Sequence, residues 1–200
     1  MSQPKVCLVA HHCNPGWGSE PLIGWRWAST LATRADLTLI THARNRAAIE
    51  AEGLRATVEY VDTEALAARV GRWNRRLWGD AAPVNHLILE TIAQAAFDRE
   101  ATRLARRAVR EGRVELIHRV SPISPRFPSR LGTLGVPFVV GPLNGGMRTA
   151  PGFEEIARSE REGALALRGL ARLLDPLGRT FTTADAILVA TETTREALPR

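Results

Sequence analysis

Short apolar runs alternate with longer helical patterns along most of the chain, and this alternation limits the possible folds more than any other feature. Six runs have the aliphatic, β-branched composition of strands: Lys5–Ala10, Leu37–Thr41, Thr57–Val61, Val114–His118, Pro137–Val140 and Ala186–Ala190. Helical patterns lie between them, near residues 20–34, 44–53, 84–111 and 154–174. Nearly continuous apolar runs are typical of parallel strands that are covered on both faces. We therefore predict an α/β fold with a doubly wound, mostly parallel, Rossmann-like sheet.

The size and composition of the chain predict one soluble domain. Its 200 residues, of which 44% are hydrophobic and 24% charged, suit a single globular domain spanning residues 1–200. The formal net charge of +6 favours anionic partners such as nucleotides, phospholipid headgroups or nucleic acid. Because no nucleic-acid-binding motif accompanies this charge, we do not expect a nucleic-acid partner.

Cysteine content and hydropathy predict a cytoplasmic location. The chain has two cysteines, Cys7 and Cys13, which cannot form a disulfide framework and suit a reducing compartment. The N-terminal apolar stretch is too short for a signal peptide, and no segment has the roughly 20 apolar residues that cross a bilayer. Any contact with a membrane is therefore expected to be peripheral, at its inner face.

The segment HHCNPGWGSEPLIGWRW, residues 11–27, follows the first predicted strand at the edge where such sheets bind ligands. Gly16 and Gly18 allow positive φ and a close approach of the backbone to a ligand. Ser19 is expected to cap a helix that begins near residue 20, and a helix N-terminus behind a glycine loop attracts phosphate. Trp17, between the glycines, is suited to stacking on a sugar or a base.

Two familiar nucleotide motifs are absent from this loop. A GxGxxG fingerprint would need glycine where Pro21 stands, and no acidic residue follows the second predicted strand, so NAD binding is not expected. No GK[ST] follows the glycines, which excludes a P-loop. His11, His12 and Cys13 lack a second pair at ligand spacing, so we expect no bound metal.

Two further segments are expected to lie at the same edge. His118 ends the fourth predicted strand, and the proline-rich loop after it offers Ser121 and Arg126 as hydrogen-bond donors. After the fifth strand, the run GPLNGG offers Asn144 and the pair Gly145–Gly146, whose amides suit a polar ligand. Ordinary turns without a ligand remain the alternative for both segments.

A basic, aromatic segment is a candidate for contact with a membrane. In RVGRWNRRLWG, residues 69–79, the apolar residues fall on one helical face among arginines, as in interfacial helices. Aromatic residues among arginines also occur in nucleic-acid binders, which is the alternative. The more uniform run RLARRAVR, residues 103–110, indicates a solvated helix face.

Four segments together resemble the N-terminal domain of family 4 glycosyltransferases, which have the GT-B fold. They are GWGSEPLIGWRWA, VELIHRVSPISPRFPS, VPFVVGPLNGG and ADAILVATETT, and they span most of the chain. Trp17 departs from the consecutive glycines of many relatives. The resemblance implies half of a GT-B fold in an enzyme that transfers a sugar, with retention, from a UDP- or GDP-sugar to a glycan or lipid-linked acceptor, without cofactor or metal.

The resemblance also assigns roles to residues. It implies donor binding by Gly16, Trp17, Gly18 and Ser19, and a catalytic position beside the transferred sugar for His118. It implies acceptor binding by Glu20, Ser121, Arg126, Asn144, Gly145 and Gly146. A departing diphosphate needs stabilisation, which backbone amides and a helix dipole can provide.

The resemblance implies a second, C-terminal domain that binds most of the nucleotide and carries a Glu-x7-Glu pair. We expect that domain to lie outside these 200 residues, because Glu154 and Glu162 have this spacing but follow the wrong strand. We therefore expect no transferase activity from this portion alone. A stand-alone module that binds a nucleotide or a phosphorylated small molecule is the alternative function, and an exposed cleft face leaves a homodimer open.

Overall fold

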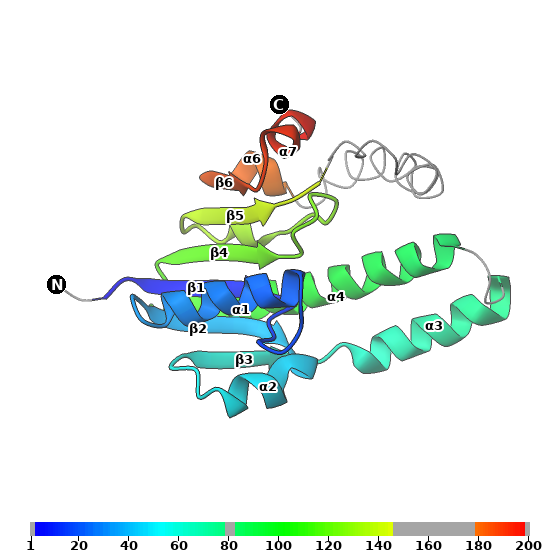
Figure 1. The fold of residues 1–200 in the computed structure, drawn as a ribbon, viewed down its shortest axis with the longest axis horizontal. Helices are drawn as coiled ribbons and strands as arrows, with labels where there is room; N and C mark the ends of the chain where they lie inside the picture. Colours follow the sequence, from blue (N-terminus) through cyan, green and yellow to red (C-terminus); the bar gives the residue numbers. More distant parts are fainter. Residues whose placement is uncertain (1–2, 79–82, 146–178, 199–200) are drawn as a thin grey trace.

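The fold is a single parallel sheet of six strands in the order β3-β2-β1-β4-β5-β6, seen in a computed structural model that describes residues 3–78, 83–145 and 179–198 (Figure 1). Every strand pairs with its neighbours in parallel. The strands are β1 (Lys5–Ala10), β2 (Asp36–His42), β3 (Thr57–Val61), β4 (Leu116–Ser121), β5 (Phe138–Leu143) and β6 (Ala186–Val189). The predicted doubly wound α/β architecture is confirmed.

The helices connect the strands across both faces of the sheet. They are α1 (Glu20–Leu31), α2 (Arg46–Ala51), α3 (Glu64–Trp78), α4 (Pro83–Arg110), α6 (Thr180–Thr183) and α7 (Glu192–Ala197), with short 3-10 turns at η1 (Ala43–Asn45) and η2 (Leu131–Thr133). The helix predicted near 154–174 lies outside the described residues. Helices α3 and α4 lie side by side and extend past the carboxyl edge of the sheet (Figure 1).

Two hydrophobic clusters, one on each face of the sheet, hold these layers together. On one face, Cys7 and Val9 of β1 pack with Phe97 and a row of small residues of α4, which are Ala101, Ala105 and Ala108. On the other face, Val6 and Leu8 of β1 pack with Ala28 of α1 and Ile49 of α2. Strand β1 is apolar throughout because alternate side chains serve opposite faces, both of which exclude water.

The fourth strand is displaced along the chain from its predicted position. We expected Val114–His118, whereas β4 runs from Leu116 to Ser121 and includes the buried polar residues Arg119 and Ser121. Contacts with loops help these residues stand in a central strand: Arg119 Nη1 donates to the Phe127 carbonyl at 2.7 Å, and Ser121 Oγ accepts from the His12 amide at 2.9 Å. Consequently His118 lies in the middle of β4, and the prediction that it ends the strand is wrong.

Within the described ranges, no helix has the length and apolar character that crossing a bilayer requires. The longest helix, α4, carries charged residues along much of its length.

Candidate functional site

The order of the strands reverses between β1 and β4, and we call the carboxyl ends of these two strands the switch point. From β1 the chain turns into α1, whose Ala28 packs on one face of the sheet. From β4 it turns to the opposite face, where Leu131 of η2 joins the cluster around α4. In open α/β sheets, ligands bind where the loops of neighbouring strands leave toward opposite faces.

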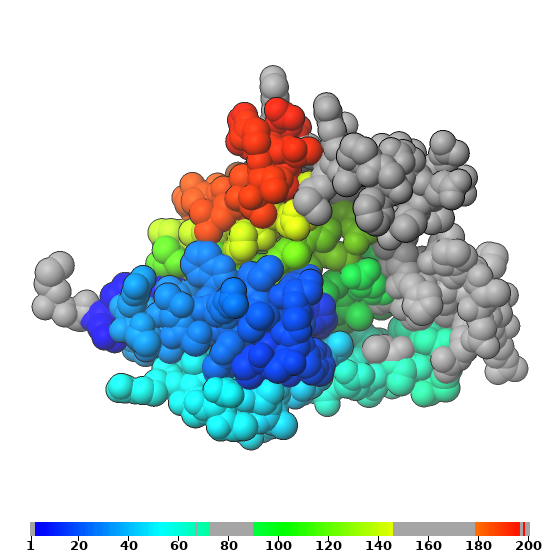
Figure 2. Space-filling model, viewed as in Figure 1, coloured from blue at the N-terminus to red at the C-terminus, as the bar shows by residue number. Residues whose placement is uncertain are grey.

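The glycine loop at this switch point is exposed. Gly16, Trp17, Gly18 and Ser19 are all exposed, and 48% of the Trp17 surface is accessible to solvent. The blue surface that contains this loop is not covered by other segments in the space-filling view (Figure 2). The chain therefore presents a run of exposed backbone directly in front of α1.

Neither glycine in this loop is required by the protein's own packing. A Cβ atom on Gly18 would have no heavy atom within 4 Å, and one on Gly16 would meet only the Asn14 Oδ1 atom, at 3.5 Å. The prediction that these glycines adopt positive φ is wrong, because the left-handed conformation in this loop belongs to Ser19, with φ of 58°. Open space beside both glycines is the feature that suits close approach by a ligand.

Helix α1 begins at Glu20, as predicted, but the Ser19 side chain makes no capping hydrogen bond. Ser19 is thus the N-cap residue by position, as predicted, but it does not cap the helix with its hydroxyl. A helix N-terminus without a side-chain cap keeps amide donors available for other acceptors, and its dipole favours negative charge.

Gly24 has the packing role that the third glycine of a dinucleotide fingerprint would have. A Cβ atom there would lie 2.1 Å from the His12 carbonyl oxygen and 3.3 Å from the Cys13 Cα atom. Only glycine lets α1 lie this close to the chain leaving β1. This contact fixes the helix N-terminus relative to the end of the strand.

Glu20 joins the loop after β1 to the loop after β4. Its Oε1 atom accepts a hydrogen bond from His12 Nδ1 at 3.2 Å and from the Ile123 amide at 3.3 Å. The His12 amide in turn donates to Ser121 Oγ at 2.9 Å. The predicted acceptor residues Glu20 and Ser121 are thus brought together, but Ser121 is fully buried and its hydroxyl serves the junction between the two loops.

The remaining predicted residues lie in the loops after β4 and β5. Arg126 is half-buried, and its Nε atom donates to Ser124 Oγ at 2.9 Å. The Asn144 amide donates to the Ile123 carbonyl at 2.9 Å, and the Gly145 amide donates to Thr194 Oγ1 at 3.2 Å. Gly146 lies outside the described residues.

His118 is buried within β4. Its Nε2 atom donates to the Gly141 carbonyl at 2.7 Å, and its ring meets the Trp27 ring edge-on, with 4.7 Å between centroids. Burial lowers the pKa of His118, while the bond to Gly141 acts in the opposite direction. A buried, neutral His118 therefore connects β4 to β5 and α1. Its catalytic role stays a prediction.

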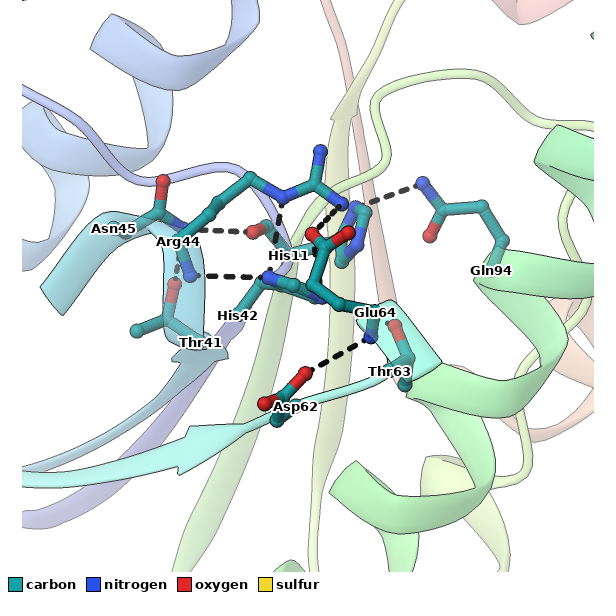
Figure 3. Close-up of polar contacts among 9 residues, drawn as sticks. All are labelled: His11, Thr41, His42, Arg44, Asn45, Asp62, Thr63, Glu64 and Gln94. Atoms are coloured by element: carbon teal, nitrogen blue, oxygen red, sulfur yellow. Dashed lines mark hydrogen bonds and ion pairs between the residues drawn. The ribbon is translucent and has the colours of Figure 1, made fainter. Parts of the chain in front are cut away.

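A second polar cluster lies at the carboxyl ends of β1, β2 and β3 (Figure 3). Its residues do not form a motif in the sequence. We call it the histidine cluster. It consists of His11, Thr41, His42, Arg44, Asn45, Thr63, Glu64 and Gln94.

Hydrogen bonds fix the His42 side of this cluster. His42 Nδ1 accepts from the amide and from Nε of Arg44, both at 3.1 Å, so its proton lies on Nε2, which donates to Thr63 Oγ1 at 3.0 Å. The Arg44 guanidinium lies 3.4 Å from a Glu64 carboxylate oxygen. Burial and the charge of Arg44 lower the pKa of His42, with Glu64 opposing them.

The His11 side of the cluster contains buried polar atoms without partners. Gln94 Nε2 donates to His11 Nδ1, and Asn45 Nδ2 donates to the His11 carbonyl, both at 2.9 Å. Among the described residues, nothing bonds to His11 Nε2, Asn45 Oδ1 or Gln94 Oε1. Burial, with smaller contributions from His12, Arg44 and His42, lowers the pKa of His11 to about 2. The cluster therefore presents a neutral imidazole, which suits neutral hydrogen-bonding groups such as hydroxyls.

The sequence contained a faint signal for this cluster. His11 and His42 each stand at the end of a predicted strand, where carboxyl-edge ligand sites form. Their partners Thr63 and Gln94 come from other elements, 21 and 83 residues away in the chain. Only the packed structure reveals these pairings.

Metal ligation finds no support in the part of the chain that the structure describes, where no group of three or more histidine, cysteine or acidic side chains is arranged to hold an ion. Cys13, a candidate ligand by sequence, is buried, and burial raises its pKa to about 12. A thiol that stays protonated is a poor metal ligand.

The basic segment 69–79 falls within α3 up to Trp78, and residue 79 lies outside the described residues. Arg69 and Arg72 are exposed, whereas the side chains from Trp73 onward are not described. Its contact with a membrane stays a prediction.

Comparisons with models of protein families, with curated proteins and with solved structures found no match to this chain.

Proposed function

We propose that the chain is the N-terminal, acceptor-side domain of a retaining glycosyltransferase. In this proposal a UDP- or GDP-sugar donates its sugar to a glycan or lipid-linked acceptor, with no metal or cofactor. The observation that carries it is the exposed loop Gly16–Ser19, whose glycines have no role in packing or backbone conformation. The resemblance of four segments to family 4 glycosyltransferases supports the same assignment.

The glycine loop is suited to the donor. Its exposed backbone lies directly before the N-terminus of α1, where amide donors and the helix dipole favour a phosphate group. Transfer of a sugar leaves a diphosphate whose negative charge increases as the bond breaks. Preorganised amides that face this charge lower the barrier without needing a metal ion.

The histidine cluster is suited to the acceptor. A neutral His11, with its Nε2 atom unpartnered among the described residues, can bind a hydroxyl, as can the carbonyl oxygen of Asn45. Sugars and polyprenyl-linked glycans present hydroxyls of this kind. The donor and acceptor sites then lie along the same carboxyl edge of the sheet.

Gly18 provides the direct test. A Gly18→Leu substitution adds a side chain where no protein atom lies within 4 Å, so it fills only the space assigned to the donor. We expect the affinity for UDP- or GDP-sugars, measured by calorimetry on the protein joined to its second domain, to fall at least about tenfold. The matched control is Gly71→Leu in α3, where a Cβ atom also has open space. Unchanged donor affinity in Gly18→Leu would reject the proposal.

A stand-alone module for a nucleotide or a phosphorylated small molecule is the second candidate, and the same glycine loop favours it. The two candidate functions predict different behaviour for the isolated 200-residue chain. A glycosyltransferase half is expected to give no turnover of nucleotide-sugars by itself, whereas a module binds its ligand with full affinity. Turnover by the isolated chain would contradict the two-domain assignment.

On this proposal the protein works in the cytoplasm, at the inner face of the membrane, where lipid-linked acceptors are found. Residues 69–79 of α3 would provide the contact. Sedimentation with vesicles that contain anionic lipid tests this directly. We expect Trp73→Ala/Trp78→Ala to reduce binding, and equal binding of the two forms would exclude this segment as an anchor.

A further inference from the structure

A groove runs along α4, between this helix and the loop that follows β4. Its volume is about 670 Å³, which lies within the range of small-molecule sites. One wall is a stripe of α4 from Thr91 to Arg106, and the other is formed by Phe127, Pro128 and Arg130. Its lining includes none of the glycine-loop residues 16–19.

Arginines dominate the walls of this groove. Arg99, Arg103 and Arg106 line it from α4, and Arg130 lines it from the opposite side. Arg103 pairs with Glu100, at 2.7 Å between Nε and Oε2. Over residues 3–78, 83–145 and 179–198, no acceptor bonds to the guanidinium groups of Arg99, Arg106 and Arg130. Guanidinium groups are well shaped to bind phosphate or carboxylate.

The two acidic residues of the groove do not cancel this charge. The Glu100 carboxylate forms an ion pair with Arg103. Asp98 accepts a 2.5 Å hydrogen bond from Ser129 Oγ and a 3.2 Å hydrogen bond from the Arg130 amide, and it faces the buried charge of Arg119. Burial raises the pKa of the Asp98 carboxyl, and the Ser129 and Arg119 contacts oppose this. The charge of Arg130 also interacts with Asp98, so an anion in the groove meets chiefly Arg99 and Arg106, which have no acidic partner among the described residues.

Neutral polar atoms on the groove wall also lack partners. Thr102 Oγ1 and Gln94 Oε1 are buried, belong to residues that are 4% and 5% exposed, and make no hydrogen bond with any described residue. Both residues line the groove. Because an unsatisfied buried hydroxyl or amide is unfavourable, such atoms mark places where a water molecule or a ligand hydroxyl is expected.

We propose that this groove is a second ligand site, which binds a small phosphorylated compound that also carries hydroxyl groups. The phosphate contacts Arg99, Arg106 and Arg130, and the hydroxyls bond to Thr102 Oγ1 and Gln94 Oε1. Phe127 and Pro128 supply the apolar surface against which the carbon skeleton packs. This site does not depend on the chain being a glycosyltransferase.

The charge requirement is tested by calorimetric titration of the 200-residue chain with fructose 1,6-bisphosphate. We expect saturable binding to the native chain and at least about a tenfold loss of affinity in Arg99→Gln/Arg106→Gln, because charge-assisted hydrogen bonds are lost. The matched control is Arg34→Gln/Arg110→Gln, which removes the same charge from exposed arginines outside the groove. An equal loss in both double variants, or no saturable binding to the native chain, would overturn the proposal.

The hydroxyl requirement is tested with Thr102→Val, which keeps the shape of the side chain and removes its oxygen. We expect it to weaken binding of fructose 1,6-bisphosphate about fivefold and to leave binding of inorganic pyrophosphate unchanged. Equal effects on both probes, or none on either, would reject the assigned role of Thr102. Thermal unfolding of each variant confirms that the fold is kept. Gly18→Leu is expected to leave this binding unchanged, so failure here is distinguishable from failure of the donor site.

Discussion

Gly24 and Gly18 stand six positions apart but have opposite surroundings. A methyl group at Gly24 would lie 2.1 Å from the His12 carbonyl oxygen, whereas one at Gly18 would meet nothing within 4 Å. We expect Gly24→Ala to lower the free energy of unfolding by about 1–3 kcal/mol or more, because α1 must move away from the strand. Gly18→Ala should change it by less than about 0.5 kcal/mol. Urea unfolding of the two variants measures the contrast, and similar values for both would contradict the packing role of Gly24.

His11 makes the stability of the protein depend on pH. Burial lowers its pKa to about 2, whereas in the unfolded chain it titrates near its ordinary value of about 6.5. Below about pH 6.5 the unfolded chain therefore binds a proton at His11 that the folded chain does not bind. The stability that comes from a neutral, buried His11 is complete above about pH 6.5 and is lost as the pH falls. We expect about 1.4 kcal/mol less stability at pH 5.5 than at pH 7.5 from this residue.

Urea unfolding at the two pH values measures this loss. Burial also lowers the pKa values of His42 and His118, which adds to the effect in the same direction. The contribution of His11 is the difference between the native chain and His11→Asn, with His12→Asn as the half-buried control. If the native chain and His11→Asn lose equal stability on acidification, His11 is not the group responsible.

The candidate site was only partly predictable at the level of residues. Gly16 and Gly18 were correctly placed on an exposed loop, since glycines after an apolar run favour that position. The roles of His11 and His42 were missed, because a histidine becomes a buried hydrogen-bonding group only through partners such as Gln94 that lie far away in the sequence. Ser19 was assigned a capping bond that its backbone conformation does not provide.

At the scale of elements, Asp98 ties α4 to the loop after β4. It accepts hydrogen bonds from Ser129 Oγ and the Arg130 amide, and it faces the buried charge of Arg119. We expect Asp98→Ala to lower the free energy of unfolding by about 3–5 kcal/mol, since a buried charge and two donors lose their partner. Glu100→Ala, which removes a carboxylate with a surface partner, should cost at most about 1 kcal/mol. Chemical denaturation tests the pair, and a mild effect of Asp98→Ala would show that the loop is held by other contacts.

The end of β4 was mispredicted because sequence patterns do not show which polar residues are buried within a strand. Arg119 and Ser121 look like loop residues, yet both are buried within the strand. Arg119 Nη1 donates to the Phe127 carbonyl, and Ser121 Oγ accepts from the His12 amide, 109 residues away. Hydropathy records only that a side chain is polar, whereas its burial depends on partners that tertiary structure supplies.

At the scale of the whole molecule, the reactivity of the two cysteine thiols measures unfolding of the protein. Cys7 lies in the central strand and Cys13 follows it, both are fully buried, and burial raises the pKa of each to about 12. We expect both to react with a thiol reagent at least about 1000-fold more slowly in the folded chain than in the unfolded one. In a Cys13→Ser variant, labelling of Cys7 should follow global unfolding measured by circular dichroism. Rapid labelling of Cys7 in the folded chain would contradict this.

The architecture was predictable because strands that are buried on both faces of a sheet have continuous apolar sequences. Strand β1 contributes Val6 and Leu8 to one cluster and Cys7 and Val9 to the other, so its residues form a continuous apolar run. General rules for such sheets then place ligand sites where the order of the strands reverses, which here is between β1 and β4.

The central position of β1 has a consequence for synthesis on the ribosome. One edge of β1 pairs with β2, which ends at His42, but the other pairs with β4, where Val6 lies opposite Leu116. At about 5–20 residues per second, the segment between these partners takes on the order of 4–15 s to translate. Throughout that interval the nascent chain carries an unpaired apolar strand edge, of the kind that pairs readily with other chains. We therefore expect chaperones to engage this protein during translation, before Leu116 emerges.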